Sequence, residues 1–522
     1  MEARAAAGQD VQTSEHGLKA GAISFWEGLV VALASTAPAY SLAAVIGSIA
    51  VAVGFYAPAA LLIAFVPMFF IAAAFYWLNK ADQDCGTTFS WVTRAMGPNT
   101  GWIAGWAVAM TGILVVGSLA DVAVFTFYDL IGADGLQSSK AAIIIGAVLL
   151  IAAMTTVCVI GTEASARMQM VLMAIQIIPL LIFIGVILWK VFSGDGPASS
   201  FEPNLSWFNP LNIEAGNLNP FSSESGGLIQ AMLLGIFIYW GWESAVNLNE
   251  ETSGDVTRPG LAGLISTIIL LITYVGVATA VLAWHGLGGA AAFDDKPGIL
   301  AKYAEGALGS PLAEIVLLAV VVSALASTQT TILPASRTAL SMARHEAIPS
   351  AFGEVSKRFF TPVFATIAIG VLATAWYVPG KLINKTFLFD SLTALGLMIA
   401  FYYALTGFAC VIYYRREIPK TWRNLLFVGL APGAGALVLT YIFVKALFNF
   451  SDPENSYTAE EWFGVAPPAV IGVGMLLVGV VLLFAWRLYK REPFFKRRTE
   501  VADPALLERG PPAEPAVAGG SK

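Results

Sequence analysis

The chain has 522 residues, of which 57% are hydrophobic and only 12% are charged, and its mean hydropathy is +0.73. Soluble domains carry about 25% charged residues, so this composition excludes a soluble globular protein and a disordered scaffold. A formal net charge of −6 gives no indication of a nucleic-acid partner. The sequence therefore predicts an integral membrane protein that lies in the lipid bilayer.

Apolar windows without charges predict twelve membrane-spanning helices. A helix needs about 20 apolar residues to cross the hydrocarbon core, and residues 28–79, which contain no charged side chain, are long enough for two. A shorter window, 225–242, continues to residue 249 as one span interrupted by polar residues. The remaining windows are 95–120, 141–162, 168–189, 259–284, 315–336, 359–380, 391–414, 424–444 and 463–486.

The distribution of positive charge predicts that both ends of the chain are cytoplasmic. Cytoplasmic loops are richer in Lys and Arg than loops on the opposite side of a membrane. Of the 29 Lys and Arg residues, those on the opposite side of this topology are Lys140, Lys190, Lys296, Lys302, Lys381, Lys385 and Lys445. The first 24 residues lack the pattern of a cleaved signal peptide. We therefore expect a multi-pass protein of the cytoplasmic membrane.

Two of the predicted spans carry helix-breaking residues near their middle. The first contains STAPAY at 35–40, where Pro38 lacks an N–H and frees carbonyls of the preceding turn. The sixth contains FIYWGWE at 237–243. Either feature alone is more often a packing feature of membrane helices. Interrupted helices in corresponding positions of two halves are typical of transporter binding sites, so the pair predicts such a site and inverted repeats made of spans 1–5 and 6–10.

Three motifs between residues 25 and 416 carry a family resemblance. Residues 335–349, ASRTALSMARHEAIP, are similar to an SR…ARDGxxP loop, although His345 and Glu346 replace the usual acid and glycine. Residues 240–244, WGWES, followed by two glutamates at 250–251, are similar to an aromatic-G-x-E-S segment with a trailing acidic pair. Residues 86–91, GTTFSW, are similar to a re-entrant loop before span 3. On these motifs the chain resembles the amino acid, polyamine and organocation (APC) transporter superfamily.

The resemblance implies an all-α polytopic membrane protein with the leucine-transporter type of fold. That fold has two inverted repeats of five helices, here followed by two C-terminal helices. Together with the charge distribution and the composition of the C-terminal tail, the predicted segments are a cytoplasmic tail 1–24, repeat 25–193, extracellular loop 194–224, repeat 225–416, helices 417–489 and a disordered cytoplasmic tail 490–522.

The resemblance also implies which residues hold the substrate. Backbone groups of the first break would bind the substrate carboxylate, and carbonyls of the second would receive its amino group, with Phe237 as an aromatic gate. The implied contacts are Ser35, Thr36, Ala37, Pro38, Phe237, Ile238, Tyr239, Trp240 and Gly241. In span 8, Ser327, Thr328 and Thr331 are candidate substrate contacts or ion ligands, although such hydroxyls more often bond the backbone one turn back.

Ionisable residues inside spans are candidates for coupling transport to an ion and for binding the substrate. A carboxylate in a span costs several kcal/mol unless it is protonated, paired or near water, which makes Glu243 a functional candidate. Gln176 stands where many relatives carry a lysine that relays a proton, and an amide cannot titrate. Glu243 is therefore the main candidate for coupling to H⁺ or Na⁺, unless transport is uncoupled exchange. Asp121 either binds a cationic substrate head or lies solvated near the outer surface.

These features predict a secondary transporter that moves amino acids by alternating access, as a symporter or antiporter. The alternatives are a polyamine or other organic-cation permease, if both Asp121 and Glu243 line the cavity, and a membrane sensor with a transporter fold. The chain has no GxxxxGK[ST] phosphate loop, and we expect neither enzymatic activity nor a cofactor. We expect no metal site, because the cysteines and histidines are scattered: Cys85, Cys158, Cys410, His16, His285 and His345.

Overall fold

The computed structural model describes residues 13–14, 16–211, 226–291, 299–383, 387–456, 460–490 and 493–502. Within these ranges the regular structure is helical, and extended pairing is limited to isolated bridges such as that between Ile23 and Thr252. Ten helical segments in the same ranges are long and apolar enough to cross a membrane. The all-helical polytopic membrane protein that the composition predicts is therefore confirmed.

The first of these segments is 57 residues long, Phe25–Ala81. It comprises α1 (Phe25–Ser35), α2 (Pro38–Val53), a short turn η2 (Gly54–Tyr56) and α3 (Ala57–Ala81). At about 1.5 Å per residue it is far longer than one crossing requires. The sequence window that predicts two spans therefore forms helices along nearly its whole length.

Nine further segments contain the remaining long helices. These helices are α5 (Pro98–Leu130), α7 (Lys140–Ile160), α8 (Thr162–Phe192), α11 (Arg258–Ala291), α13 (Leu312–Arg344), α14 (Val363–Ile383), α15 (Phe387–Tyr413), α17 (Ala431–Asn449) and α18 (Pro467–Lys490). Shorter helices are α4 (Thr88–Met96), α6 (Asp134–Gln137), α9 (Gly226–Tyr239), α10 (Ser244–Asn247) and α12 (Ile299–Leu308), with the turn η5 (Asn249–Glu251).

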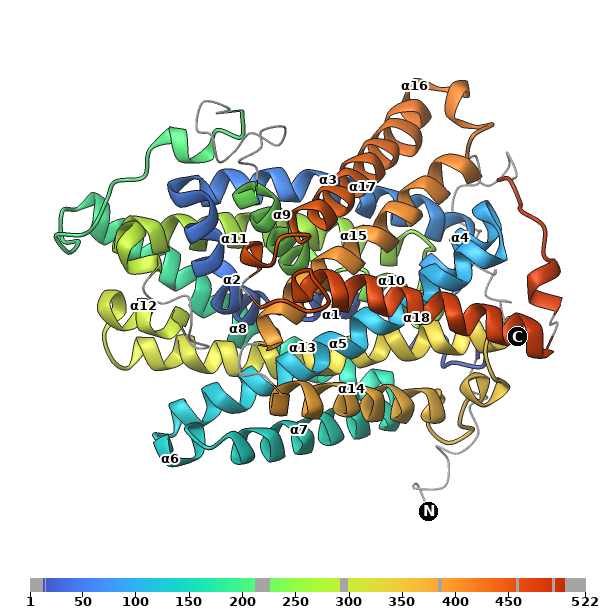
Figure 1. The fold of residues 1–522 in the computed structure, drawn as a ribbon, viewed down its shortest axis with the longest axis horizontal. Coiled ribbons are helices and arrows are strands. Elements are labelled where there is room, and N and C mark those ends of the chain that lie inside the picture. Colours follow the sequence, from blue (N-terminus) through green and yellow to red (C-terminus); the bar gives the residue numbers. More distant parts are fainter. Residues whose placement is uncertain are drawn as a thin grey trace, which may run out of the picture.

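Helices α5 and α13 form the centre of the molecule. They run side by side in Figure 1, with α7 and α14 on one side and α3 and α17 on the other. The most apolar window of α5 or α13 is 83% buried, whereas that of α7 or α17 is only 33% buried. The peripheral helices therefore present apolar side chains outward, as helices that face lipid do.

The two predicted helix breaks are present in the structure. Between α1 and α2, Ala37 adopts a left-handed conformation with φ 48°, and Pro38 begins α2, where its missing N–H costs no helical bond. Between α9 and α10 the chain leaves the helix at residues 240–243, and Gly241 has φ 118°. Glycine reaches such positive φ values without steric cost. Local sequence chemistry thus explains both interruptions.

Several segments meet on one face, which we call the N-terminal face. It is formed by residues 13–14 and 16–24, the loop 82–87, η5, the end of α13 and residues 493–502. Phe494 stacks on Phe89 with 5.6 Å between ring centroids, and the backbone N–H of Ala502 donates to the carbonyl of Tyr413. The expectation of a disordered tail from residue 490 is therefore wrong for residues 493–502. The later part of that tail, 503–522, lies outside the described residues.

Candidate functional site

The two helix breaks lie against each other in the middle of the bundle. The Ser35 hydroxyl at the end of α1 is 2.6 Å from the hydroxyl of Ser244, which begins α10. The backbone of Gly241 packs on the peptide group of Ser35 so closely that a β-carbon would not fit. The two interrupted segments are therefore in direct contact.

A small cavity of about 20 Å³ lies between the breaks. Its lining residues are Ser35, Val108, Gly112, Trp240, Gly241, Glu243, Ser244, Asn247, Thr331, Pro334 and Ala335. They come from α1, α5, the second break, α10 and α13. A cavity of this size holds about one water molecule, so the structure shows the chain closed around the breaks.

Glu243 is the acidic residue of this cavity, and its side chain is held in place by α15. Tyr402 donates to its Oε1 over 2.7 Å, and Tyr403 donates to its Oε2 over 2.6 Å. The N–H of Gly241 donates to Oε2 over 3.0 Å, and Trp240 donates to the Tyr402 hydroxyl. The residue is 6% exposed, and none of the ion pairs in the described ranges includes it. The carboxylate therefore has three hydrogen-bond donors and no nearby described cation.

Of the predicted contacts in the two breaks, Ser35, Trp240 and Gly241 line the cavity, and the others lie at the neighbouring helix ends. Thr36 and Ala37 form the first break, and α2 begins at Pro38. Residues 237–239 form the last turn of α9, where the Tyr274 hydroxyl donates to the carbonyl of Ile238. A helix start carries partial positive charge and a helix end partial negative charge. The two breaks therefore offer complementary partial charges in one place.

The three hydroxyl residues of α13 make different contacts. Ser327 donates to the carbonyl of Ser35 over 2.8 Å, which ties α13 to the first break. Thr328 donates to the carbonyl of Ala324 one turn back, which is the backbone contact that hydroxyls in such helices most often make. Thr331 lines the cavity, and its buried hydroxyl oxygen has no hydrogen-bond partner in the described ranges. Among the three, Thr331 is the one whose hydroxyl is available to a ligand.

The predicted residues outside the cavity lining are Thr36, Ala37, Pro38, Phe237, Ile238, Tyr239, Ser327, Thr328, Asp121 and Gln176. Asp121 is 2% exposed, accepts a hydrogen bond from Tyr377 and pairs with Lys381 Nζ at 2.9 Å. It therefore fits neither expected alternative, a cavity ligand or a solvated surface acid. Gln176 is buried in α8, and both of its amide atoms lack hydrogen-bond partners in the part of the chain that is described.

Sequence reasoning missed the tyrosine pair at 402–403 and Asn247, and it noted Ser244 only as part of the WGWES motif. No local pattern marks the two tyrosines, because tyrosines are common in membrane helices near interfaces. Their role follows only from the packing of α15 on the second break.

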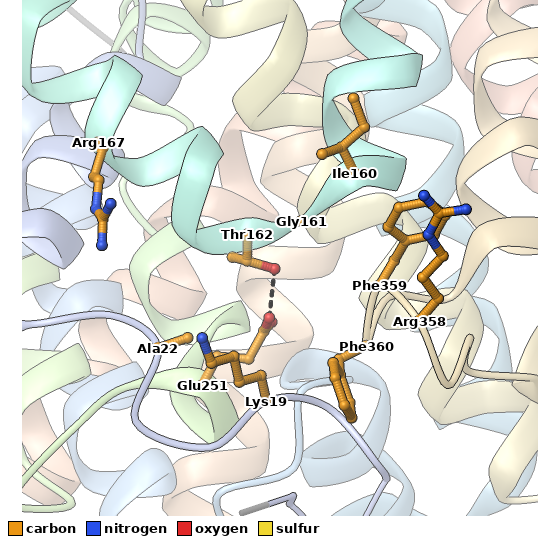
Figure 2. A pocket seen from close by; sticks show the side chains of 10 residues that line it. All are labelled: Lys19, Ala22, Ile160, Gly161, Thr162, Arg167, Glu251, Arg358, Phe359 and Phe360. Atoms are coloured by element: carbon orange, nitrogen blue, oxygen red, sulfur yellow. Dashed lines mark hydrogen bonds between the residues drawn. The ribbon is translucent and has the colours of Figure 1, made fainter. Parts of the chain in front are cut away.

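A second and larger pocket of about 430 Å³ opens on the N-terminal face. Figure 2 shows Glu251 at its centre beside Lys19, with Arg167 and Arg358 at opposite sides. Thr162 donates to Glu251, and Arg337 binds both carboxylate oxygens at 3.1 and 3.2 Å. Arg337 is fully buried. This buried pair lies between the N-terminal face and the cavity-lining part of α13.

A polytopic helical bundle with two opposed helix breaks around a closed cavity is the architecture of a membrane transporter. The chain belongs to the amino acid permease family, whose family model matches residues 23–484. This match confirms the resemblance to the APC superfamily and identifies a secondary transporter rather than an enzyme.

Individual relatives cover most of the chain at low identity. The branched-chain amino acid permease BcaP of Lactococcus lactis is 22% identical over 437 residues, which is 80% of this chain and 84% of BcaP. The low-affinity putrescine importer PlaP of Escherichia coli K12 is 21% identical over 395 residues, 75% of this chain and 81% of PlaP. An uncharacterized transporter of Mycobacterium tuberculosis is 25% identical over 407 residues, 76% of each chain.

Proposed function

We propose that the chain transports a neutral α-amino acid with an aliphatic side chain through the cavity between the helix breaks. The observation that carries this proposal is the pairing of opposite helix ends around one cavity. The lining residues Ser35 and Trp240 lie within three residues of the start of α2 and the end of α9, so the first helix end would bind the carboxylate and the second would bind the ammonium group. The hydroxyls of Ser35 and Thr331 supply further polar contacts.

The apolar wall of the cavity supports an aliphatic side chain. Val108 and Gly112 on α5 face Pro334 and Ala335 on α13, and none of these side chains is polar. The relative BcaP, a branched-chain amino acid permease, is consistent with such a substrate.

A diamine is a weaker candidate, although PlaP is a putrescine importer. A diamine carries two positive charges and needs two carboxylates or equivalent acceptors in a desolvated site. The cavity lining contains one carboxylate, Glu243, and Asp121 is already paired with Lys381. The alternative that requires both Asp121 and Glu243 in the cavity therefore has less support.

We further propose that Glu243 couples transport to protons. Its carboxylate lines the cavity and lies at the second break, so it is placed to exchange a proton when the site opens to either side. Gln176 cannot titrate, and the other candidate acid, Asp121, has a lysine partner. Protonation of Glu243 would turn an acceptor of hydrogen bonds into a donor and so alter its contacts with Tyr402 and Tyr403.

The proposal includes a topology of twelve spans with both ends in the cytoplasm. The 57-residue segment Phe25–Ala81 counts as two crossings, and α9 with α10 counts as one interrupted crossing. The breaks in the first and sixth spans support inverted repeats 25–193 and 225–416, followed by the helices in 417–489. In this topology the N-terminal face is the cytoplasmic one.

Ligand-induced stabilisation of the purified protein in detergent tests the proposed substrate. A ligand present at 100 times its dissociation constant adds about 2.7 kcal/mol to the folded state. We expect leucine, isoleucine or valine to raise the melting temperature, and Thr331→Val to reduce that effect while Thr328→Val does not. Stabilisation by putrescine alone would instead identify an amine permease. Uptake of the stabilising compound into proteoliposomes then establishes transport.

A further inference from the structure

Two histidines and two carboxylates gather on the N-terminal face, and none of them lines the cavity. His16 comes from the N-terminal segment, Asp84 from the loop between α3 and α4, Glu250 from η5, and His345 directly follows α13. The ring centroids of His16 and His345 are 6.2 Å apart. The expectation that the histidines are too scattered for a metal site is therefore wrong for these two.

The spacing of the side chains is close to that of a metal centre. One candidate ligand atom from each of His16, Asp84 and His345 lies within 4.8 Å of the other two. Zinc binds nitrogen and oxygen ligands at about 2.0–2.2 Å in tetrahedral geometry, which places ligand atoms on the order of 3.4 Å apart. Side-chain rotations that move each ligand atom by about an ångström would therefore bring the three atoms to the spacing of a zinc site.

His345 directs its Nε2 atom toward the cluster. Its Nδ1 is 3.1 Å from the carbonyl oxygen of Ser341, which only accepts hydrogen bonds, so Nδ1 carries a proton. Nε2 lies 3.4 Å from Oδ2 of Asp84. In the neutral ring, Nε2 carries the lone pair that can bind a metal ion, and the carboxylate oxygen of Asp84 lies beside it.

The other two ligands are also held by neighbouring groups. His16 Nδ1 is 2.6 Å from Oε1 of Glu250, so this carboxylate orients the imidazole ring. Asp84 accepts from the Ser341 hydroxyl and the Gly86 N–H through Oδ1, which leaves Oδ2 for the cluster. Metal-ligating histidines and carboxylates in proteins are oriented by outer partners of this kind.

Glu250 adds a further buried carboxylate oxygen to this cluster. Its side chain is 6% exposed, and its Oε2 atom is buried without a hydrogen-bond partner in the described part of the chain. Positive charge nearby stabilises a buried carboxylate, whether it comes from a protonated His16 or from a metal ion. A second triad of His16, Glu250 and the Cys85 sulfur also lies within 4.8 Å, so further ligand atoms adjoin the first triad.

We propose that His16, Asp84 and His345 bind one divalent transition metal ion of the zinc type, with Glu250 orienting His16. The ion ties the N-terminal segment to the loop 82–87 and to the end of α13. If this face must open during transport, as the proposed alternating access requires, the bound ion holds it closed and slows uptake. Metal binding itself does not depend on the identity of the substrate.

Calorimetric titration of the chelator-treated, full-length protein in detergent with ZnCl₂ tests the site. We expect one ion per chain, at least tenfold weaker binding in His16→Ala and in His345→Ala, and a 10- to 100-fold loss in Glu250→Gln. The matched control is His285→Ala, a histidine of α11 outside the cluster, which keeps the wild-type affinity. Wild-type affinity in His16→Ala, or no saturable zinc binding by the wild type, overturns the proposal.

A second measurement needs no variant. Co²⁺ bound to the wild-type protein should give the visible absorption of a four-coordinate nitrogen and oxygen site, and Zn²⁺ should displace it. Absorption typical of six-coordinate, hydrated Co²⁺ would contradict the proposed ligands. Because neither measurement involves transport, their failure is distinguishable from failure of the amino acid permease proposal.

Discussion

Gly241 and Ser35 are in backbone contact: a β-carbon at position 241 would lie 2.8 Å from both the carbonyl carbon and the carbonyl oxygen of Ser35. Backbone atoms cannot move aside as a flexible side-chain tip can. The contact therefore joins the first helix break to the second, and both residues line the cavity between the breaks.

Gly241→Ala should abolish ligand binding and lower the melting temperature. The alanine would clash with Ser35, and a non-glycine residue with a φ of 118° costs about 1–3 kcal/mol. Ligand-induced stabilisation and uptake into proteoliposomes measure the effect. Gly474→Ala in α18 is the matched control, because a β-carbon there has no atom within 4 Å. Normal uptake by Gly241→Ala would show that the breaks do not need this contact.

Glu243→Gln should remove the pH dependence of uptake while the protein still folds. The amide has nearly the same shape and can still accept from one of the two tyrosines at 402–403, but it cannot exchange a proton. Initial uptake rates in proteoliposomes at acidic and neutral external pH give the measurement. Tyr403→Phe, which keeps the carboxylate and removes one donor, separates hydrogen bonding from proton exchange. An unchanged pH profile in Glu243→Gln would exclude Glu243 from coupling.

Arg337→Met should destabilise the closed N-terminal face. Removing one partner of a buried ion pair costs about 3–5 kcal/mol, whereas replacing both partners by apolar residues is often close to neutral. Arg337 is fully buried and binds both oxygens of Glu251. We therefore expect a large fall in melting temperature for Arg337→Met and a partial recovery in the double variant with Glu251→Met. Equal melting temperatures of wild type and Arg337→Met would indicate that water compensates Glu251.

The sequence predicts best what short-range chemistry determines. Pro38 and Gly241 mark the two breaks because their backbone properties act within a turn of the helix. The charge-free window 28–79 likewise forms helices, because a membrane requires internally satisfied backbone groups. Such features need no knowledge of the neighbouring helices.

Partners that are distant in sequence could not be predicted. Tyr402 and Tyr403 are separated from Glu243 by 159 and 160 residues. The approach of His16 to His345 depends on how residues 13–24 fold back over the N-terminal face. The rotation of each helix about its own axis determines which side chains meet. The nearly uniform hydrophobicity of buried membrane helices gives little information on that rotation.

Asp121→Asn should reduce stability without weakening ligand binding. Asp121 pairs with Lys381 and accepts from Tyr377, and it is absent from the cavity lining. Asparagine can still accept from the tyrosine, but it leaves the charge of Lys381, whose side chain is 15% exposed, without its carboxylate. We expect a lower melting temperature, ligand affinity within about twofold of wild type, and partial recovery of the melting temperature in the double variant with Lys381→Met. A loss of affinity beyond about tenfold, with an unchanged melting temperature, would show instead that Asp121 contacts the substrate.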